Sequence, residues 1–310
     1  MIADLLESTI RLATPIALAS MGAAVCERVG IINIAMEGIM VVGAFFAALV
    51  AYYSGDPWLG MLAGTVAGGM YSSIHAFATV TLHLNHVVSG AVLNIGALGI
   101  TRFLMVVSFG HPGTTPSVPV SLAAYRWEIP LLSEIPFVGE VLFSQTPIAY
   151  LSIVVLVLLW YVLFRTKVGL HIRSSGEHPL ALETLGVSVR RMRYLAVTIS
   201  GLTSGLAGAF LSIENNSSFT EGMSNGRGFI ALAANISGGW NPIGSFIASQ
   251  FFGFADALQV RFQVTQALGV PAELFIIFPY VATLIAVAGL VRHSRPPKAL
   301  GEDFHIEEQD

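Results

Sequence analysis

The chain has a single cysteine, Cys26, and this scarcity excludes both an intramolecular disulfide and a CxxC metal or redox site. The sequence also lacks the GxxxxGKS/T loop that cradles nucleotide phosphates, the HExxH zinc motif and the GxSxG nucleophile elbow. We therefore expect no catalysis within this chain, no cofactor and no bound metal. Energy for any active process would have to come from a partner protein or from an ion gradient.

Charged residues are also few, at 11% of the chain, whereas hydrophobic residues make up 54% and the mean hydropathy is +0.73. Soluble domains carry about twice this share of charge, so the composition places the chain in a bilayer. The formal net charge of -4 provides no basic surface for nucleic acid, and no such partner is expected. Residues 1–7 contain no lysine or arginine, so we expect the first hydrophobic run to be retained rather than cleaved as a signal peptide.

Long hydrophobic runs are abundant, and about 20 mainly apolar residues suffice for one transmembrane helix. The candidate segments are residues 8–25, 33–53, 58–82, 87–108, 147–164, 194–213, 228–237, 242–260 and 271–291. The segment at 228–237 is too short to span alone, so it predicts a broken or re-entrant element shielded by protein. The expected fold class is an all-α integral membrane bundle of about 8 to 10 transmembrane helices with broken or re-entrant elements.

Lysine and arginine are concentrated at residues 165–193 and again after residue 291, and the positive-inside rule places both stretches in the cytoplasm. The loop at 109–147, with Arg126 as its only lysine or arginine, then lies outside, as does the N-terminus. We expect one transmembrane domain over residues 1–295, with these two loops, followed by an acidic cytoplasmic tail at 296–310. The end of that tail, residues 301–310, is expected to be disordered.

Polar groups at membrane depth are costly and therefore informative. Asn33 and Glu37 stand four residues apart and are predicted to share one helix face. Glu37 either lines a hydrated substrate path or orders a broken helix by accepting backbone hydrogen bonds; the alternative is a purely structural acid, satisfied by Asn33 or a neighbouring helix end. The further substrate-path candidates, for which interhelical hydrogen bonding is the alternative, are Ser89, Asn94, Asn235 and Asp256.

Residues 168–193 form the most informative soluble stretch. Within it, residues 175–186 have the form of a short helix, with Pro179 near its start, leucines at 180, 182 and 185, and Gly186 as a stop. Leucines on a short cytoplasmic helix are exposed unless a partner covers them. This pattern therefore predicts a contact with a cytoplasmic partner.

Three ordered motifs resemble a known family. The sequence GLHIRSSGEHPLALETLGVSVRRMRYLAVTISGLTSGLAGAFLS is similar to the cytoplasmic loop and following helix of ABC transporter permeases of the ribose and branched-chain amino acid superfamily. NIAMEGIMVVGAF at 33–45 and GRGFIALAANISGGWNPIGS at 226–245 resemble its nucleoside and simple-sugar uptake branch. The resemblance covers most of the chain, roughly residues 27–290.

The resemblance implies a permease domain that conducts nucleosides or simple sugars across the inner (plasma) membrane of a prokaryote. It also implies three kinds of partner: a second, related permease, cytoplasmic ATP-binding subunits, and an extracytoplasmic substrate-binding protein. The resemblance favours a permease pair that is a heterodimer. An ATPase-coupling helix would comprise Gly176, Glu177, Pro179, Ala181, Glu183 and Gly186. Against the family pattern, this sequence departs at His178, Leu182 and Asn235, and the added polar group of Asn235 leaves the preferred substrate open.

A second hypothesis is a secondary transporter of small polar solutes, driven by protons or sodium, with Glu37 or Asp256 as the coupling acid. The missing ATP site does not discriminate, because ABC permeases use the ATPase of a partner. The leucine-bearing cytoplasmic helix favours the permease, since an autonomous carrier does not need it. A membrane-embedded enzyme would need a cluster of acid, base or metal ligands at one depth, and the scattered polar residues argue against it.

Overall fold

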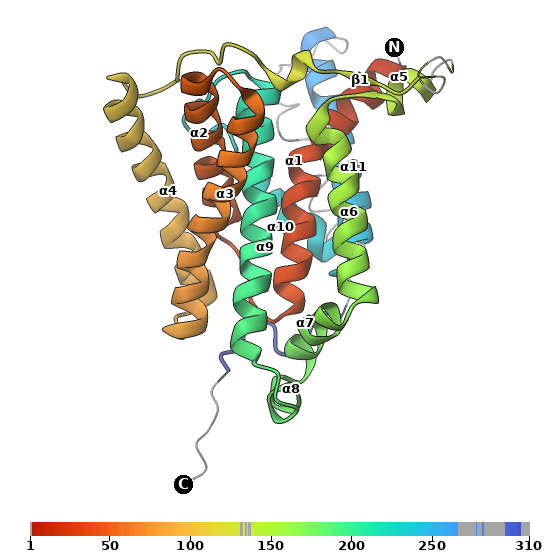
Figure 1. Ribbon diagram of the computed structural model, residues 1–310. Coiled ribbons are helices and arrows are strands. Elements are labelled where there is room, and N and C mark those ends of the chain that lie inside the picture. The colour runs from red at the N-terminus through yellow and green to blue at the C-terminus, as the bar shows by residue number, and fades with distance from the viewer. Residues whose placement is uncertain are drawn as a thin grey trace.

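The computed structural model describes residues 2–130, 133, 135, 138–265, 277, 281 and 295–304, and its architecture is an all-α bundle (Figure 1). The helices are α1 (Ile2–Arg28), α2 (Met36–Ser54), α3 (Pro57–Ala76), α4 (His86–Phe109), α5 (Val138–Leu142), α6 (Pro147–Arg165), α7 (Lys167–Glu177), α8 (Pro179–Thr184), α9 (Val189–Ala209), α10 (Arg227–Ser237) and α11 (Pro242–Thr265). Two π-helical turns, η1 (Phe77–Thr81) and η3 (Phe210–Asn215), extend α3 and α9, and η2 (Leu122–Ala124) is a 3-10 turn. The only strands in the described part of the chain, β1 (Trp127–Glu128) and β2 (Ser144–Gln145), pair antiparallel.

Five of the described helices are long and apolar enough to cross a membrane: residues Ile2–Arg28, Met36–Ser54, His86–Phe109, Pro147–Arg165 and Val189–Asn215. The sequence predicted a span in each of these places. The predicted span at 228–237 is the short helix α10, as its length required, and the predicted span at 271–291 lies almost wholly outside the described residues. The chain is therefore a multi-pass membrane protein.

The core of the bundle surrounds α1, which packs against α6, α9, α10 and α11 (Figure 1). Its side chains from Ala13 to Glu27 are all buried. By contrast, α4 lies at one edge beside α2 and leaves a row of aliphatic side chains exposed, with Ile95 at 73% and Val107 at 67%. The first turn of α1 lies at one end of the bundle, and α7, α8 and the segment 295–304 lie at the other.

Helix starts follow the sequence closely. Asp56 caps α3 by accepting a hydrogen bond from the Trp58 backbone N–H (2.8 Å), and Pro57 occupies the first helical position. Asn85 caps α4 by accepting from the N–H groups of Val87 (2.9 Å) and Val88 (3.1 Å). Both patterns satisfy backbone donors that the first helical turn leaves without partners.

Helices α2, α3 and α9 approach closely enough for backbone contact. A Cβ placed on Gly68 would lie 2.5 Å from the Cα of Gly205, and one on Gly64 would lie 2.5 Å from the carbonyl oxygen of Gly43. Small residues four apart permit such approach in membrane helices. These glycines therefore act as helix-packing contacts.

At the N-terminal end, two loops close over the bundle. The backbone N–H of Thr115 donates to the carbonyl of Phe219 (2.9 Å), and that of Val118 donates to Ser217 (2.8 Å). Arg126, the only lysine or arginine of the 109–147 loop, forms an ion pair with Glu7 of α1. The backbone hydrogen bonds join the loop at 109–147 to the segment that leads into α10, and the ion pair joins the same loop to α1.

Candidate functional site

Two interruptions of the helical backbone lead to the same place. The chain leaves α1 at Arg28, continues without helix through residues 29–35, and starts α2 at Met36. From the opposite end of the bundle, it leaves η3 at Asn215, returns through residues 216–226, and starts α10 at Arg227. The first turns of α2 and α10 meet at Glu37, a geometry in which irregular backbone is shielded by protein.

Glu37 holds the beginning of α10 with its carboxylate. Oε1 accepts hydrogen bonds from Ser224 Oγ (2.6 Å) and the Gly226 N–H (2.8 Å), and Oε2 accepts from the Gly228 N–H (2.7 Å). A negative charge at a helix N-terminus compensates the unpaired N–H groups and the helix dipole. These contacts fit both the ordering of a broken helix and the structural alternative of an acid held by a neighbouring helix end. The partners of Glu37 belong to the N-terminal end of α10 and not to Asn33.

Asn94 holds the beginning of α2 in the same way from α4. Its Oδ1 accepts from the Gly38 N–H (2.8 Å), and its Nδ2 donates to the Ile34 carbonyl (3.0 Å). Asn94 is eight residues beyond His86, which corresponds to a rise of roughly 12 Å along α4. The junction therefore lies well inside the span, where polar groups require internal partners.

A cavity of about 280 Å³ opens beside this junction. It is lined by Glu37, Gly38, Val41, Asn94, Ile95, Leu98, Gly222, Ser224, Asn225 and Phe229. Two of the six substrate-path candidates, Glu37 and Asn94, thus share one cavity. Asn225 and Phe229 were missed by the sequence analysis, although the dipeptide Asn225-Gly226 is a turn signal immediately before a helix.

The other candidates lie elsewhere. Asn33 was predicted to share a helix face with Glu37, and this was wrong: α2 begins only at Met36, and the buried Asn33 donates to Ser200 Oγ of α9 (3.1 Å). Ser89 Oγ is hydrogen-bonded to His75 Nδ1 of α3 (2.9 Å). Asp256 lies on α11, within electrostatic range of Arg227.

Asn235 belongs to a buried hydrogen-bond network between α1 and the α10–α11 turn. Its Nδ2 donates to Glu27 Oε2 (2.9 Å), which also accepts from Trp240 Nε1 (2.5 Å). Arg28 adds two hydrogen bonds to this network: its Nε donates to the Trp240 carbonyl (2.7 Å) and its Nη2 to the Gly239 carbonyl (3.2 Å). Glu27 and Trp240 are 213 residues apart, so no local pattern could have paired them.

The proposed coupling stretch forms two helices instead of one. Its residues Gly176 and Glu177 end α7, whereas Pro179, Ala181 and Glu183 lie in α8 and Gly186 follows with a φ of 79°. The residue before a proline is disfavoured in the helical region, and His178 accordingly has φ −146° and ψ 75°. Leu180 of α8 and Leu185 in the following turn are exposed, at 63% and 79%, but Leu182 is buried at 3%, so the prediction of three exposed leucines was wrong for Leu182. Glu183 accepts a hydrogen bond from the Val189 N–H (2.7 Å).

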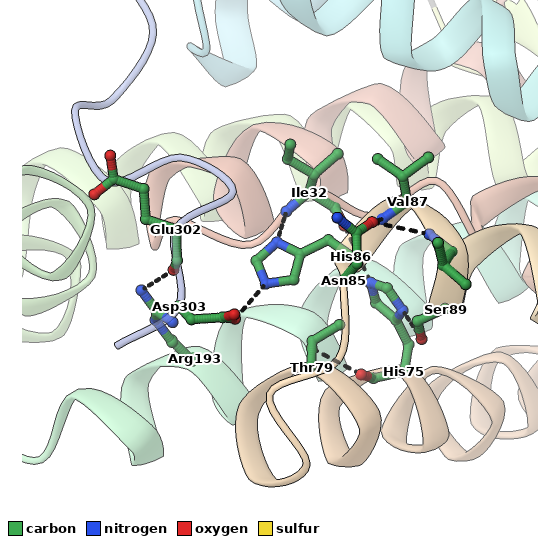
Figure 2. A network of polar contacts seen from close by, with 11 residues as sticks. Ile32, His75, Thr79, Asn85, His86, Val87, Ser89, Arg193, Glu302 and Asp303 are labelled. Atoms are coloured by element: carbon green, nitrogen blue, oxygen red, sulfur yellow. Dashed lines mark hydrogen bonds and ion pairs between the residues drawn. The ribbon is translucent and has the colours of Figure 1, made fainter. Parts of the chain in front are cut away.

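The segment 295–304 packs against this same end of the bundle. The Ala299 N–H donates to the Gly176 carbonyl (2.8 Å), and Arg193 Nη2 donates to the Glu302 carbonyl (3.1 Å). Figure 2 shows Asp303 directed at His86, whose Nε2 lies 3.9 Å from Asp303 Oδ1. The expectation of disorder from residue 301 was therefore wrong for residues 301–304, and the rest of that prediction lies outside the described residues.

Comparison with known proteins gives an independent result. The family described as "Branched-chain amino acid transport system / permease component" matches residues 5–287. The guanosine ABC transporter permease NupQ of Bacillus subtilis is 38% identical, over 96% of this chain and 95% of that protein. The nucleoside ABC transporter permease NupC of Lactococcus lactis is 39% identical, over 94% and 93%.

More distant similarities were also found. The putative glucose ABC transporter permease TsgC13 of Haloferax volcanii is 36% identical over 91% of this chain and 85% of that protein. The permeases NupP of B. subtilis and NupB of L. lactis are 25% and 24% identical over 86–90% of this chain. No solved structure matches the chain.

Proposed function

The chain belongs to the permease family of branched-chain amino acid transport systems, and from this membership we propose that it forms the path for nucleosides in an ABC importer. As a permease, it is a transport subunit rather than an enzyme. The proposal places the solute at the junction of α2, α4 and α10, where Glu37 and Asn94 fix two broken elements around a cavity.

The observation that carries this proposal is that the only charged side chain among the described residues lining that cavity, Glu37, is already used by the fold. Among the described residues that line it there is no lysine, arginine or aspartate, and the carboxylate of Glu37 already accepts three hydrogen bonds. A zwitterionic amino acid would need groups that compensate its two charges. An uncharged solute with hydroxyl and amide groups needs only hydrogen bonds, which suits a nucleoside.

The names of the relatives support the same class of solute. Two of the proteins that cover nearly all of this chain are permeases for guanosine or nucleosides, whereas the putative glucose permease is somewhat less similar. Simple sugars remain the alternative within the family. We place Ser89, Asn33, Asn235 and Asp256 outside the path, as groups that hold the surrounding helices together.

Partners follow from what this chain lacks. Without a nucleotide-binding motif of its own, the permease would depend on cytoplasmic ATP-binding subunits, which the exposed Leu180 and Leu185 would contact. B. subtilis and L. lactis each have a second, more distant permease beside the close relative, which supports a heterodimer here. An extracytoplasmic substrate-binding protein would deliver the solute over the loop at 109–147, and the inner membrane of a prokaryote is the proposed location.

The organisation proposed is one permease domain over residues 1–295, with a coupling loop at 165–193 and a cytoplasmic tail at 296–310. Residues 296–304 of this tail belong to the segment 295–304, which packs against the bundle.

Uptake in cells tests the function directly. Radiolabelled guanosine, uridine, adenosine and ribose are offered to cells with the gene, without it, and without it but carrying a plasmid copy. Loss of nucleoside uptake in the deletion and its return with the plasmid are expected. Unchanged nucleoside uptake in the deletion, or loss of ribose uptake alone, would contradict the proposal.

A further inference from the structure

Two side chains at the cavity are unlike the rest of its lining, because the fold does not engage them. Asn225 is exposed, and its carboxamide makes no hydrogen bond with any residue that the structure describes. Phe229, on the first turn of α10, leaves 48% of its surface exposed. Both border the cavity.

The remaining polar groups of the lining are already committed. Glu37 caps α10, and Asn94 uses both its Oδ1 and its Nδ2 on the backbone of residues 34–38. Ser224 Oγ donates to Glu37. Within the described lining, recognition of a solute therefore falls to the Asn225 amide and the Phe229 ring.

The backbone fixes the positions from which both side chains extend. Asn225 has a φ of 46°, and asparagine is one of the few residues with a side chain that adopts this left-handed region readily. The Phe229 N–H donates to the Gly226 carbonyl (3.0 Å), and Gly226 itself is fixed by Glu37. The amide and the ring are thus carried by the same capped helix start, with their Cα atoms at fixed relative positions.

We propose that Phe229 stacks on the nucleobase of the transported nucleoside and that Asn225 pairs with the edge of that base. An aromatic face stacks on any base, and a carboxamide offers one acceptor and two donors to the hydrogen-bonding edge. A cavity of about 280 Å³ accommodates one small ligand. This inference rests on the proposed function and adds which residues discriminate a nucleoside from a free sugar.

Photo-crosslinking tests the pair without depending on transport rate. The purified permease complex is irradiated with 8-azidoadenosine or 5-azidouridine, and the labelled peptide is identified by mass spectrometry. Label is expected within residues 222–229, removed by an excess of adenosine or uridine and unaffected by ribose. Phe229→Leu should lower labelling by both probes about tenfold through loss of stacking, and Phe229→Trp should retain it.

Phe251→Leu is the matched control, because Phe251 on α11 is equally exposed, at 49%, and does not border the cavity. Asn225→Gly tolerates the positive φ while it removes the amide, and it should change the ratio of labelling between the two probes. Label that falls elsewhere, labelling of Phe229→Leu equal to that of Phe251→Leu, or no competable label in a complex that transports nucleosides would overturn the inference. A complex that transports no nucleoside would instead count against the proposed function.

Discussion

The backbone N–H of Gly301 donates to the carbonyl oxygen of Gly30 (2.9 Å), which joins the C-terminal segment to the break between α1 and α2. Gly30 has a φ of 103°, and a Cβ there would lie 2.9 Å from the Ala299 carbonyl oxygen. The docked segment 295–304 therefore rests on a residue that tolerates no side chain. Because residues 29–35 lead directly to Glu37, this contact connects the end of the bundle that carries α7 and α8 to the cavity.

Gly30→Ala should release the docked segment. The new methyl group would push against Ala299 while the backbone is strained, and trypsin should then cleave after Lys298 several times faster in the purified complex. Gly55→Ala is the control, because Gly55 also has a positive φ, 71°, but nothing within 4 Å of the new Cβ. Equal cleavage rates in the two variants would contradict the contact between Gly30 and the segment 295–304.

Glu37→Ala should destabilise the junction of α2 and α10. The substitution leaves two backbone N–H groups and the Ser224 hydroxyl without their acceptor, and hydrogen bonds to a charged group contribute about 1.5–3 kcal/mol each. We expect a lower midpoint of thermal unfolding in detergent and loss of transport. Glu128→Ala, at an exposed position, should leave the midpoint unchanged. Equal midpoints for Glu37→Ala and Glu128→Ala would show that the fold does not need the Glu37 cap.

Gly68→Ala should separate α3 from α9. The added Cβ would lie 2.5 Å from the Cα of Gly205, and overpacking of this kind costs about 1–3 kcal/mol. Gly99→Ala on α4 meets nothing within 4 Å and should be neutral or stabilising by up to about 1 kcal/mol, since alanine favours helix. The midpoint of thermal unfolding and the yield of monodisperse protein are measured for both variants. Similar behaviour of the two variants would refute the close packing.

Leu185→Asp should weaken coupling to the ATPase without damage to the fold. Leu185 is 79% exposed, so the substitution disturbs a docking surface rather than the interior. Uptake is expected to fall more than tenfold at normal membrane levels, with less ATPase subunit recovered on purification. Leu84→Asp, at an exposed position in the turn between η1 and α4 and outside the loop at 165–193, should behave as wild type. Full uptake by Leu185→Asp would remove α8 from the proposed interface.

The sequence predicted the bundle well because hydropathy and helix length are local properties. It also identified Glu37, since a carboxylate within an apolar run requires a reason. It did not identify Phe229 or Asn225, because their exposure depends on how deeply residues 216–226 return into the bundle. Nor could it separate Asn33 from Glu37, because Gly30 and the extended residues after it move the start of α2 to Met36.

The glycine contacts among α2, α3 and α9 also limit how the protein can move. Helices whose backbones touch have no side-chain layer that could deform, so this trio moves as one rigid body. α4 lies at the edge of the bundle with an exposed face and packs mainly on α2, so we expect it to have more freedom. A transport cycle that opens the cavity first to one side and then to the other would use the trio as its fixed frame and α4 as a moving part.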